Sequence, residues 1–368
     1  MLWFIPGLIA LIFGAELLVR GGARLALSFG ISPLVVGLTV VAFGTSAPEL
    51  AVSVQAAWSG RVDIGLGNVV GSNIVNILLI LGVSALITPL IVHQQLVRQE
   101  VPLMIGLSFL VWGMALDGGI RRGEGILLVT ILVAYTVFLI RQSRRETAAD
   151  IREEYDEAIA GEGWPIERHA WGQIVLVLGG IALLVLGSTW LVEAAVTFAR
   201  WAGMSELVVG LTVVAVGTSL PEIATSILAA IRGQRDIAVG NVVGSNIFNI
   251  LAVLGVAASV APAELTVSPA MLAFDLPVMV AVAVACLPIF FTGYLIARWE
   301  GALFLGYYLV YTAYLLMDAS GDAATGGLGR VMIWFVLPLT AITLVVLAGR
   351  AWHAQHQARS LNAAGDGE

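Results

Sequence analysis

The stretch Leu34–Val83 occurs twice in this 368-residue chain, and this duplication constrains the fold more than any other feature. A shift of 173 residues, without a gap, places it on Leu207–Val256 with identity at 35 of 50 positions. Each copy carries one carboxylate, Glu49 or Glu222, inside an otherwise apolar segment. Two matching acids on a duplicated apolar frame are typical of an ion site formed between two halves of a transporter.

The surroundings of these acids are apolar, because 59% of the residues are hydrophobic and only 12% are charged. At ~1.5 Å per residue, a helix of ~20 apolar residues crosses the ~30 Å hydrocarbon core of a bilayer. Lipid cannot hydrogen-bond an open backbone, so we expect every span to be helical. The apolar runs predict eleven spans: 2–19, 33–58, 64–91, 101–116, 125–140, 172–199, 206–231, 237–261, 270–291, 301–317 and 331–349.

The duplication continues weakly beyond its core, since Glu100–Val101–Pro102 resembles Asp275–Leu276–Pro277. The repeat unit therefore holds five spans, and an odd number makes the second unit enter the membrane from the opposite side. The predicted fold is an all-α membrane protein, an inverted 5+5 transmembrane helix repeat with one extra C-terminal helix. Its parts are a first five-helix repeat at 1–141, a cytoplasmic linker at 142–170, a second five-helix repeat at 171–317, and the extra helix with its tail at 318–368.

The basic residues indicate the orientation of the chain, and all 18 of them are arginine. With the N-terminus outside, thirteen arginines fall on the cytoplasmic side and five outside, which the positive-inside rule favours. Arg121 and Arg122 are the one pair that this orientation leaves outside. No basic segment precedes the first apolar run, so we expect residues 2–19 to be a retained helix and not a cleaved signal peptide.

Two aspartates allow two interpretations. Asp63 and Asp236 each follow a glycine turn, at Gly60 and Gly233, and each precedes an apolar run. They could be ligands at the mouth of a pore, or helix N-caps near the positive end of a helix. The N-cap is the interpretation that we favour. Ser32, which precedes a proline, is likewise expected to cap a helix.

The acids of the repeat carry the chemistry. An ionised carboxylate at the bilayer centre costs at least ~2.5–3.5 kcal/mol on insertion scales, so such acids are usually functional. Glu49 and Glu222 are therefore expected to bind a cation. The alternative is a structural ion pair with an arginine such as Arg20 or Arg24, but these lie near the predicted end of a helix.

The residues before each acid favour the ion site. Pro48 cannot donate to the carbonyl of Gly44 and opens that turn, while Thr45 lies one helical turn from Glu49 with Ser46 beside it. Carbonyl, hydroxyl and carboxylate oxygens then meet in one place, as a hard cation such as Ca²⁺ requires. The second copy repeats the set at Gly217, Thr218, Ser219, Pro221 and Glu222.

The next span of each copy carries a polar stripe. Asn68, Ser72 and Asn76 are spaced by four residues and share one helix face. Such a stripe can contact an ion or can hydrogen-bond neighbouring helices. Ion contact is the interpretation favoured for Ser72, Asn76, Ser245 and Asn249. Bonding between helices is expected of Asn68, Asn73, Asn241 and Asn246.

The motif GlyThrSer-x-ProGlu, followed by GlyAsnValValGlySerAsnIle-x-Asn and present twice, resembles the cation/Ca²⁺ exchanger superfamily, specifically its prokaryotic sodium/calcium exchangers. The resemblance covers both repeats, about 320 residues. It implies Na⁺/Ca²⁺ antiport by alternating access in a prokaryotic plasma (inner) membrane, with the first and sixth spans sliding as a pair. The pocket that it implies consists of Thr45, Ser46, Glu49, Ser72, Asn76, Thr218, Ser219, Glu222, Ser245 and Asn249, with backbone contacts near Ala42 and Ala215.

The chain departs from this pattern in two ways. Some relatives carry an aspartate at one of the positions that match Asn76 and Asn249, whereas both are amides here. The formal charge of the pocket is therefore near −2, which one Ca²⁺ or two Na⁺ would neutralise and which leaves a third Na⁺ uncompensated. The usual plan has ten helices, so the resemblance does not imply the span at 331–349.

Other functions remain as alternatives. A Ca²⁺/H⁺ or other divalent cation/H⁺ antiporter would use the same acids, although such relatives usually carry a GlyAsn-x-x-Glu-like motif at this place. A cation channel is a different class, and inverted halves with occluding helices favour a carrier. The absence of lysine and of a HisGlu-x-x-His motif disfavours an intramembrane enzyme. We expect no cofactor, no nucleic acid and no protein partner, only the lipid bilayer and the transported Ca²⁺ and Na⁺.

Overall fold

The computed structural model describes residues 3–29, 32–145, 169–201, 215–291 and 293–319, together with 345 and 349. Within them, six helices are long and apolar enough to cross a membrane. A seventh span results if Leu34–Thr45 and Ala47–Trp58, which are bent by 48°, count as one. The prediction of an all-α membrane protein is confirmed. The linker and nearly all of the span 331–349 lie outside the described residues, so the count of eleven stays a prediction.

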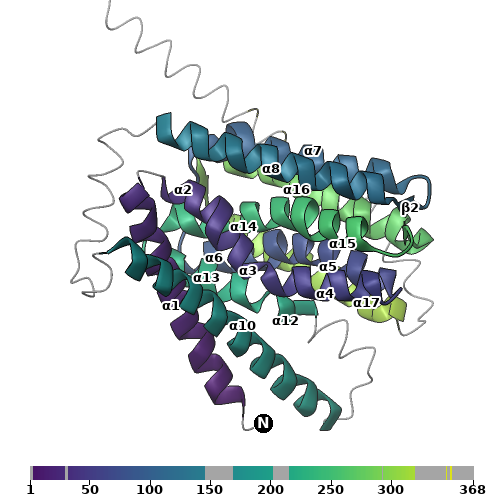
Figure 1. The fold of residues 1–368 in the computed structure, drawn as a ribbon, viewed down its shortest axis with the longest axis horizontal. Coiled ribbons are helices and arrows are strands. Elements are labelled where there is room, and N and C mark those ends of the chain that lie inside the picture. The colour runs from purple at the N-terminus through teal and green to yellow at the C-terminus, as the bar shows by residue number, and fades with distance from the viewer. Residues whose placement is uncertain are drawn as a thin grey trace, which may run out of the picture.

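Each half of the chain runs through the same order of elements (Figure 1). The first half contains α1 (Phe4–Phe29), α2 (Pro33–Val36), η1 (Gly37–Val41), α3 (Ala42–Thr45), α4 (Ala47–Trp58), α5 (Val62–Val75), η2 (Asn76–Leu81), α6 (Gly82–Ile87), β1 (Leu90–Ile91), η3 (Leu96–Glu100), α7 (Val101–Ala115), β2 (Gly119–Ile120) and α8 (Arg122–Arg145). The second half contains α10 (Ala170–Trp201), α12 (Ala215–Thr218), α13 (Leu220–Ile231), α14 (Arg235–Phe248), η6 (Asn249–Leu254), α15 (Gly255–Val260), β3 (Leu265–Thr266), η7 (Met271–Asp275), α16 (Leu276–Phe291), β4 (Leu295–Ile296) and α17 (Arg298–Ala319).

The boundaries of several spans differ from the prediction. The first helix ends at Phe29 and not at residue 19, because the helix continues after the apolar run stops at Arg20. The predicted span 64–91 ends as a helix at Ile87, and Leu90–Ile91 form a strand instead. Ser32 caps the helix that follows it, as expected, because its Oγ accepts a hydrogen bond from the Val35 amide at 3.3 Å.

Four two-residue strands, which the sequence did not predict, connect the halves crosswise. β1 of the first half pairs with β4 of the second, and β2 of the first half pairs with β3 of the second, both antiparallel. The last long helix of each half also contacts the other half, since α8 packs against α15 and α17 packs against α6. The two halves therefore form one interlocked body around their shared core.

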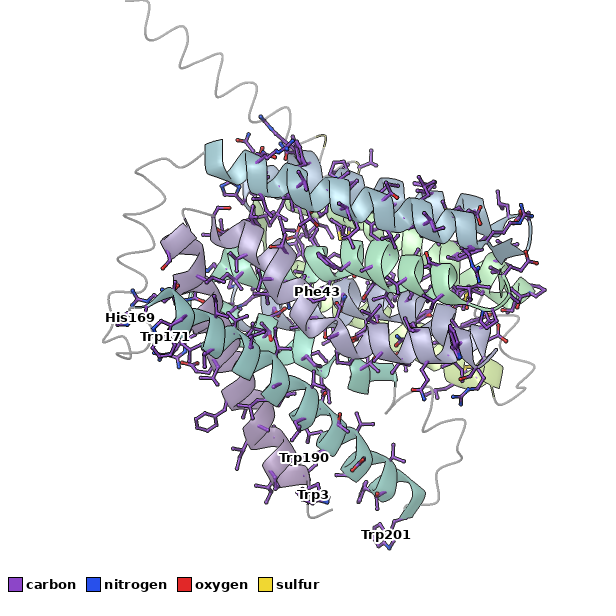
Figure 2. All side chains as sticks on the ribbon, in the orientation of Figure 1. Trp3, Phe43, His169, Trp171, Trp190 and Trp201 are labelled. Carbon is purple, nitrogen blue, oxygen red and sulfur yellow. The ribbon has the colours of Figure 1, made fainter. Side chains whose placement is uncertain are left out.

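The helices α1 and α10 form a separate antiparallel pair that lies obliquely to the other helices (Figure 1). Glycines bring their backbones together: a Cβ on Gly180 would lie 2.6 Å from the Leu18 amide nitrogen, and a Cβ on Gly14 would lie 2.8 Å from that of Leu184. Figure 2 shows Trp3, Trp190 and Trp201 at the projecting end of the pair and Trp171 at its other end. Because no larger side chain fits between the two backbones, we expect α1 and α10 to move together.

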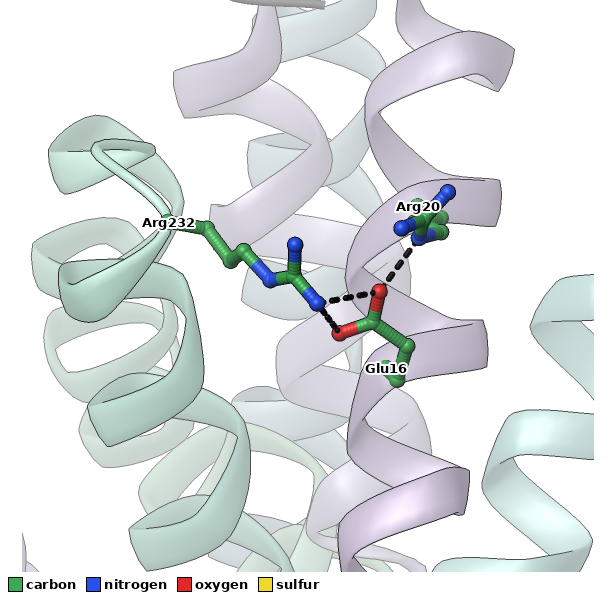
Figure 3. A network of polar contacts seen from close by, with 3 residues as sticks. All are labelled: Glu16, Arg20 and Arg232. Carbon is green, nitrogen blue, oxygen red and sulfur yellow. Dashed lines mark hydrogen bonds and ion pairs between the residues drawn. The ribbon is translucent and has the colours of Figure 1, made fainter. Parts of the chain in front are cut away.

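An ion pair links α1 to the second repeat (Figure 3). Both carboxylate oxygens of Glu16 accept from one Nη of Arg232, at 2.8 and 2.9 Å, and Arg20 of the same helix also bonds this carboxylate. Arg232 directly follows α13. Arg20 is thus engaged by Glu16 in the described structure, which weakens the interpretation of Glu49 as the partner of this arginine.

Candidate ion-binding site

A helix break precedes each acid of the repeat. Ser46 separates α3 from α4 with φ −82° and ψ 8°, and Ser219 separates α12 from α13 with φ −86° and ψ 8°. As predicted, a proline follows each break and cannot continue the hydrogen-bond ladder. Glu49 and Glu222 then lie in the first turn of α4 and α13, where the helix dipole favours a negative charge.

The two glutamates are buried and are held by serines of the opposite half. Ser46 Oγ donates to Glu222 Oε1 at 3.1 Å, and Ser219 Oγ donates to Glu49 Oε1 at 3.3 Å. Glu49 is 0% exposed and Glu222 is 1% exposed. The crossed bonds place both acids at the contact between the halves. Each acid is therefore oriented by a residue that lies more than 150 positions away in the chain.

Two amides of the polar stripes bond across the same contact. Thr45 Oγ1 donates to Asn241 Oδ1 at 3.2 Å, and Thr218 Oγ1 donates to Asn68 Oδ1 at 3.4 Å. The NH₂ group of each asparagine donates at 2.9 Å to a serine of the preceding helix in its own half. The expectation that Asn68 and Asn241 bond neighbouring helices is confirmed.

Asn76 and Asn249 begin the π-helical turns η2 and η6. Such turns are frequent at functional sites, because the widened turn redirects a side chain. Asn76 Nδ2 donates to Asn246 Oδ1 at 3.0 Å, and Asn249 Nδ2 donates to Asn73 Oδ1 at 3.1 Å. Both amides are thus anchored through nitrogen, which leaves their oxygens available.

Four buried side-chain oxygens of this region have no hydrogen-bond partner among the described residues. They are Glu49 Oε2, Glu222 Oε2, Asn76 Oδ1 and Asn249 Oδ1. Leaving such a group unsatisfied costs about 1–3 kcal/mol, and more for a charged group. The four oxygens come from two pairs of duplicated positions, so one accidental packing defect does not account for them. A cation that they coordinate would satisfy all four.

The remaining residues of the predicted pocket lie along the same contact. Ser72 Oγ is 3.5 Å from Ser219 Oγ, and Ser245 Oγ is 3.5 Å from Thr45 Oγ1. The Ala42 carbonyl accepts from the Ser46 amide at 3.0 Å, so it already closes the last turn of α3. Ala215 begins α12, and its side chain is not among those described. The role of these residues as ligands stays a prediction.

The N-cap interpretation of the two aspartates is wrong in its detail. The N-cap of α5 is Arg61 and that of α14 is Gln234, so Asp63 and Asp236 lie inside the first turn of their helices. They lie near the positive helix end as expected. The glycine turns before them are confirmed by positive φ angles of 72° at Gly60 and 76° at Gly233.

Sequence reasoning missed a second duplicated pair of acids. Tyr135 Oη donates to the buried Glu100, and Tyr311 Oη donates to Asp275 at 3.0 Å. The match between the segments of Glu100 and Asp275 was the available signal, but nothing in it indicated a tyrosine partner. Each pair fastens the fourth long helix of its half to the fifth. In the described part of the chain, no three His, Cys, Asp or Glu residues group as a metal site.

Comparison with known proteins gives consistent matches to one family. Residues 1–141 and 172–317 match the family described as "Sodium/calcium exchanger protein". The chain is 33% identical to the sodium/calcium exchanger MaX1 of Methanosarcina acetivorans over 338 residues, which are 84% of this chain and 96% of that protein. It is 42% identical to the putative antiporter CaxA of Alkalimonas amylolytica over 262 residues, 71% of this chain and 81% of that protein. The fold matches a structure of the sodium-calcium exchanger NCX_Mj with a TM-score of 0.72 at 30% identity, covering 85% of this chain and 97% of that one.

Proposed function

The chain belongs to the sodium/calcium exchanger family, and on this premise we propose that it exchanges Na⁺ for Ca²⁺ across the membrane by alternating access. Membership makes it an integral membrane transporter and not an enzyme. Ca²⁺ would bind between Glu49 and Glu222, with Na⁺ as the exchanged ion.

The observation that carries this proposal is the set of four buried oxygens without partners on Glu49, Asn76, Glu222 and Asn249. Ca²⁺ takes 6–8 oxygen ligands at ~2.3–2.6 Å, from carboxylates, amides, carbonyls and water. The hydroxyls of the neighbouring serines and threonines can complete such a shell. The two acids supply the charge, and the two amides supply neutral oxygens.

Charge gives a reason for exchange in place of one-way transport. An empty pocket would carry two ionised carboxylates through an occluded state of low dielectric, which is costly. One Ca²⁺ or two Na⁺ neutralise the pair and permit the transition. The empty carrier would rarely cross, so inward Na⁺ movement would be coupled to outward Ca²⁺ movement.

The proposal includes an inverted five-plus-five architecture, with the N-terminus outside a prokaryotic inner membrane. The crossed contacts support it, because the bonds of Ser46, Thr45 and Asn76 to the second half each have a counterpart from the second half to the first. The proposed parts keep the boundaries 1–141, 142–170, 171–317 and 318–368. In this scheme α1 and α10 slide together over the site.

The test is ion flux in reconstituted vesicles with the Na⁺, H⁺ and K⁺ gradients varied independently. An outward Na⁺ gradient should drive uptake of radioactive Ca²⁺ at constant pH, and Glu222→Gln should abolish it. Glu193→Gln, an exposed acid of α10, is the control and should transport normally. If a pH gradient drives uptake without Na⁺, the chain is a Ca²⁺/H⁺ antiporter. If Glu222→Gln retains normal Na⁺-driven flux, the site is assigned wrongly.

A further inference from the structure

Two buried methionines end the hydrogen-bond chains that hold Asn76 and Asn249. Asn246, which accepts from Asn76, places its own Nδ2 3.5 Å from the sulfur of Met104. In the other half, Asn73 accepts from Asn249 and places its Nδ2 3.6 Å from the sulfur of Met279. Met104 lies on α7 and Met279 on α16, and both are 1–2% exposed. Neither helix contributes a residue to the predicted pocket.

The chemistry of the sulfur gives each chain a direction. An asparagine amide has one accepting oxygen and one donating nitrogen of nearly equal size, so its orientation is set by its partners. A thioether sulfur can only accept. Asn246 must therefore turn its NH₂ group to Met104, which leaves its oxygen facing Asn76. Asn76 must then donate, and its own oxygen is left as the group without a protein partner.

The reverse orientation would present the wrong atom to a cation. If Asn246 turned by 180°, its oxygen would face the lone pairs of Met104 and its NH₂ group would face Asn76. Asn76 would then turn to accept, and its NH₂ group would point to the place where its oxygen now lies. An NH₂ group repels a cation, so this turn would remove one ligand from the site.

The arrangement occurs in both halves with the same order of residue types. Met104 and Met279 are offset by 175 positions, the same offset that relates Glu100 to Asp275. The remaining buried methionine of the described core, Met271, makes no printed contact with an amide and lies beside Gly67. The pairing of a methionine with the second amide is therefore a property of these two places.

We propose that Met104 and Met279 are positioning residues, which fix the Asn76 and Asn249 amides so that oxygen and not nitrogen faces the transported cation. The inference rests on the proposed function, because it takes these oxygens as ligands. A carboxylate has two equivalent oxygens and needs no such device. The two methionines thus matter because this chain has amides at both positions.

The test begins with Met104→Leu, which keeps the side-chain volume and removes the acceptor. The apparent Ca²⁺ KM in vesicles should rise about fivefold, which is within the range of one lost hydrogen bond, while kcat stays within about twofold. Met279→Leu should act alike in the other half. Met271→Leu is the matched control and should leave the KM unchanged. Equal KM values for all three variants and the unmodified protein would overturn the inference.

A second background separates orientation from packing. In Asn76→Asp the introduced carboxylate needs no fixed direction and prefers a donating Asn246, whose turn the loss of Met104 would ease. Adding Met104→Leu to Asn76→Asp should therefore leave the KM unchanged or lower it, whereas a packing defect would raise it equally in both backgrounds. Direct titration of the purified protein with Ca²⁺ by calorimetry gives the same comparison for Kd. If the unmodified protein binds Ca²⁺ but shows no Na⁺-driven flux, the proposed function fails while the effect on Kd still decides the inference.

Discussion

The core around Glu49 and Glu222 is built from matched pairs of contacts, whereas the attachment of α1 and α10 to that core is not. Every crossed bond of the core has its counterpart: Ser46 with Glu222 and Ser219 with Glu49. The ion pair between Glu16 and Arg232 has none, because a shift of 173 residues places Thr189 and Ser59 at the equivalent positions. If the halves exchange conformations during transport, a duplicated contact contributes equally to both states and a single one favours one state.

The largest expected effect breaks the symmetric core at its acids. Glu49→Gln and Glu222→Gln should each lower Na⁺-driven Ca²⁺ uptake at least about 100-fold, because one negative charge cannot neutralise a divalent cation in a buried site. Uptake of radioactive Ca²⁺ into vesicles measures both variants against Glu193→Gln. Normal uptake by either glutamine variant alone would show that the two halves do not share the work.

A smaller effect is expected at the serines that hold the acids. Ser46→Ala and Ser219→Ala each remove one hydrogen bond to a charged group, worth about 1.5–3 kcal/mol, so the apparent Ca²⁺ affinity should fall at least about tenfold. The symmetry of the core predicts similar losses for the two variants. Ser59→Ala, at an exposed serine, serves as the control. A loss confined to one serine would contradict the equivalence of the halves.

The ion pair tests the asymmetric region. Glu16→Gln should change the ratio of the apparent Ca²⁺ KM values on the two membrane sides by about two- to fivefold, because a partly exposed pair contributes about 0–1 kcal/mol. Oriented vesicles, with Ca²⁺ added on one side at a time, measure this ratio. Arg232→Gln should give the same shift. Equal changes of KM on both sides would show that the pair does not select a state.

The smallest expected effect concerns charge. With two acids and two amides in the core, the exchange of two Na⁺ for one Ca²⁺ moves no net charge. Uptake should therefore change by less than about twofold when a K⁺ diffusion potential is imposed with valinomycin. A steep dependence on the potential would show that a third Na⁺ moves without a countercharge. In that case Asn76→Asp should alter the dependence more than Asn76→Ser.

The sequence predicted the membrane class and the residues of the core, because duplication marks positions that are constrained twice. It also predicted the helix breaks at Pro48 and Pro221, since proline acts locally. It could not predict the partners across the contact. Ser46 is three residues from Glu49 but bonds Glu222, because the register between the halves is a property of their packing and of neither repeat alone.

Other features lay outside the reach of local patterns. The π-helical turns begin at Asn76 and Asn249, and no residue type announces a π turn. The methionines at 104 and 279 read as ordinary apolar residues of a span, and only the structure shows the amides beside them. The continuation of α1 beyond Arg20 depends on its pairing with α10, which hydropathy does not register.

The crossed strands have a consequence for the synthesis of the protein. β1 ends at Ile91, and its partner β4 begins at Leu295, so about 200 residues are made between them. At about 5–20 residues per second, a ribosome needs roughly 10–40 s to supply the partner. During that interval the first half resides in the membrane with unpaired strand edges and with Glu49 lacking the serine that orients it. Biogenesis of this chain therefore has a late closing step, at which both halves acquire their final form together.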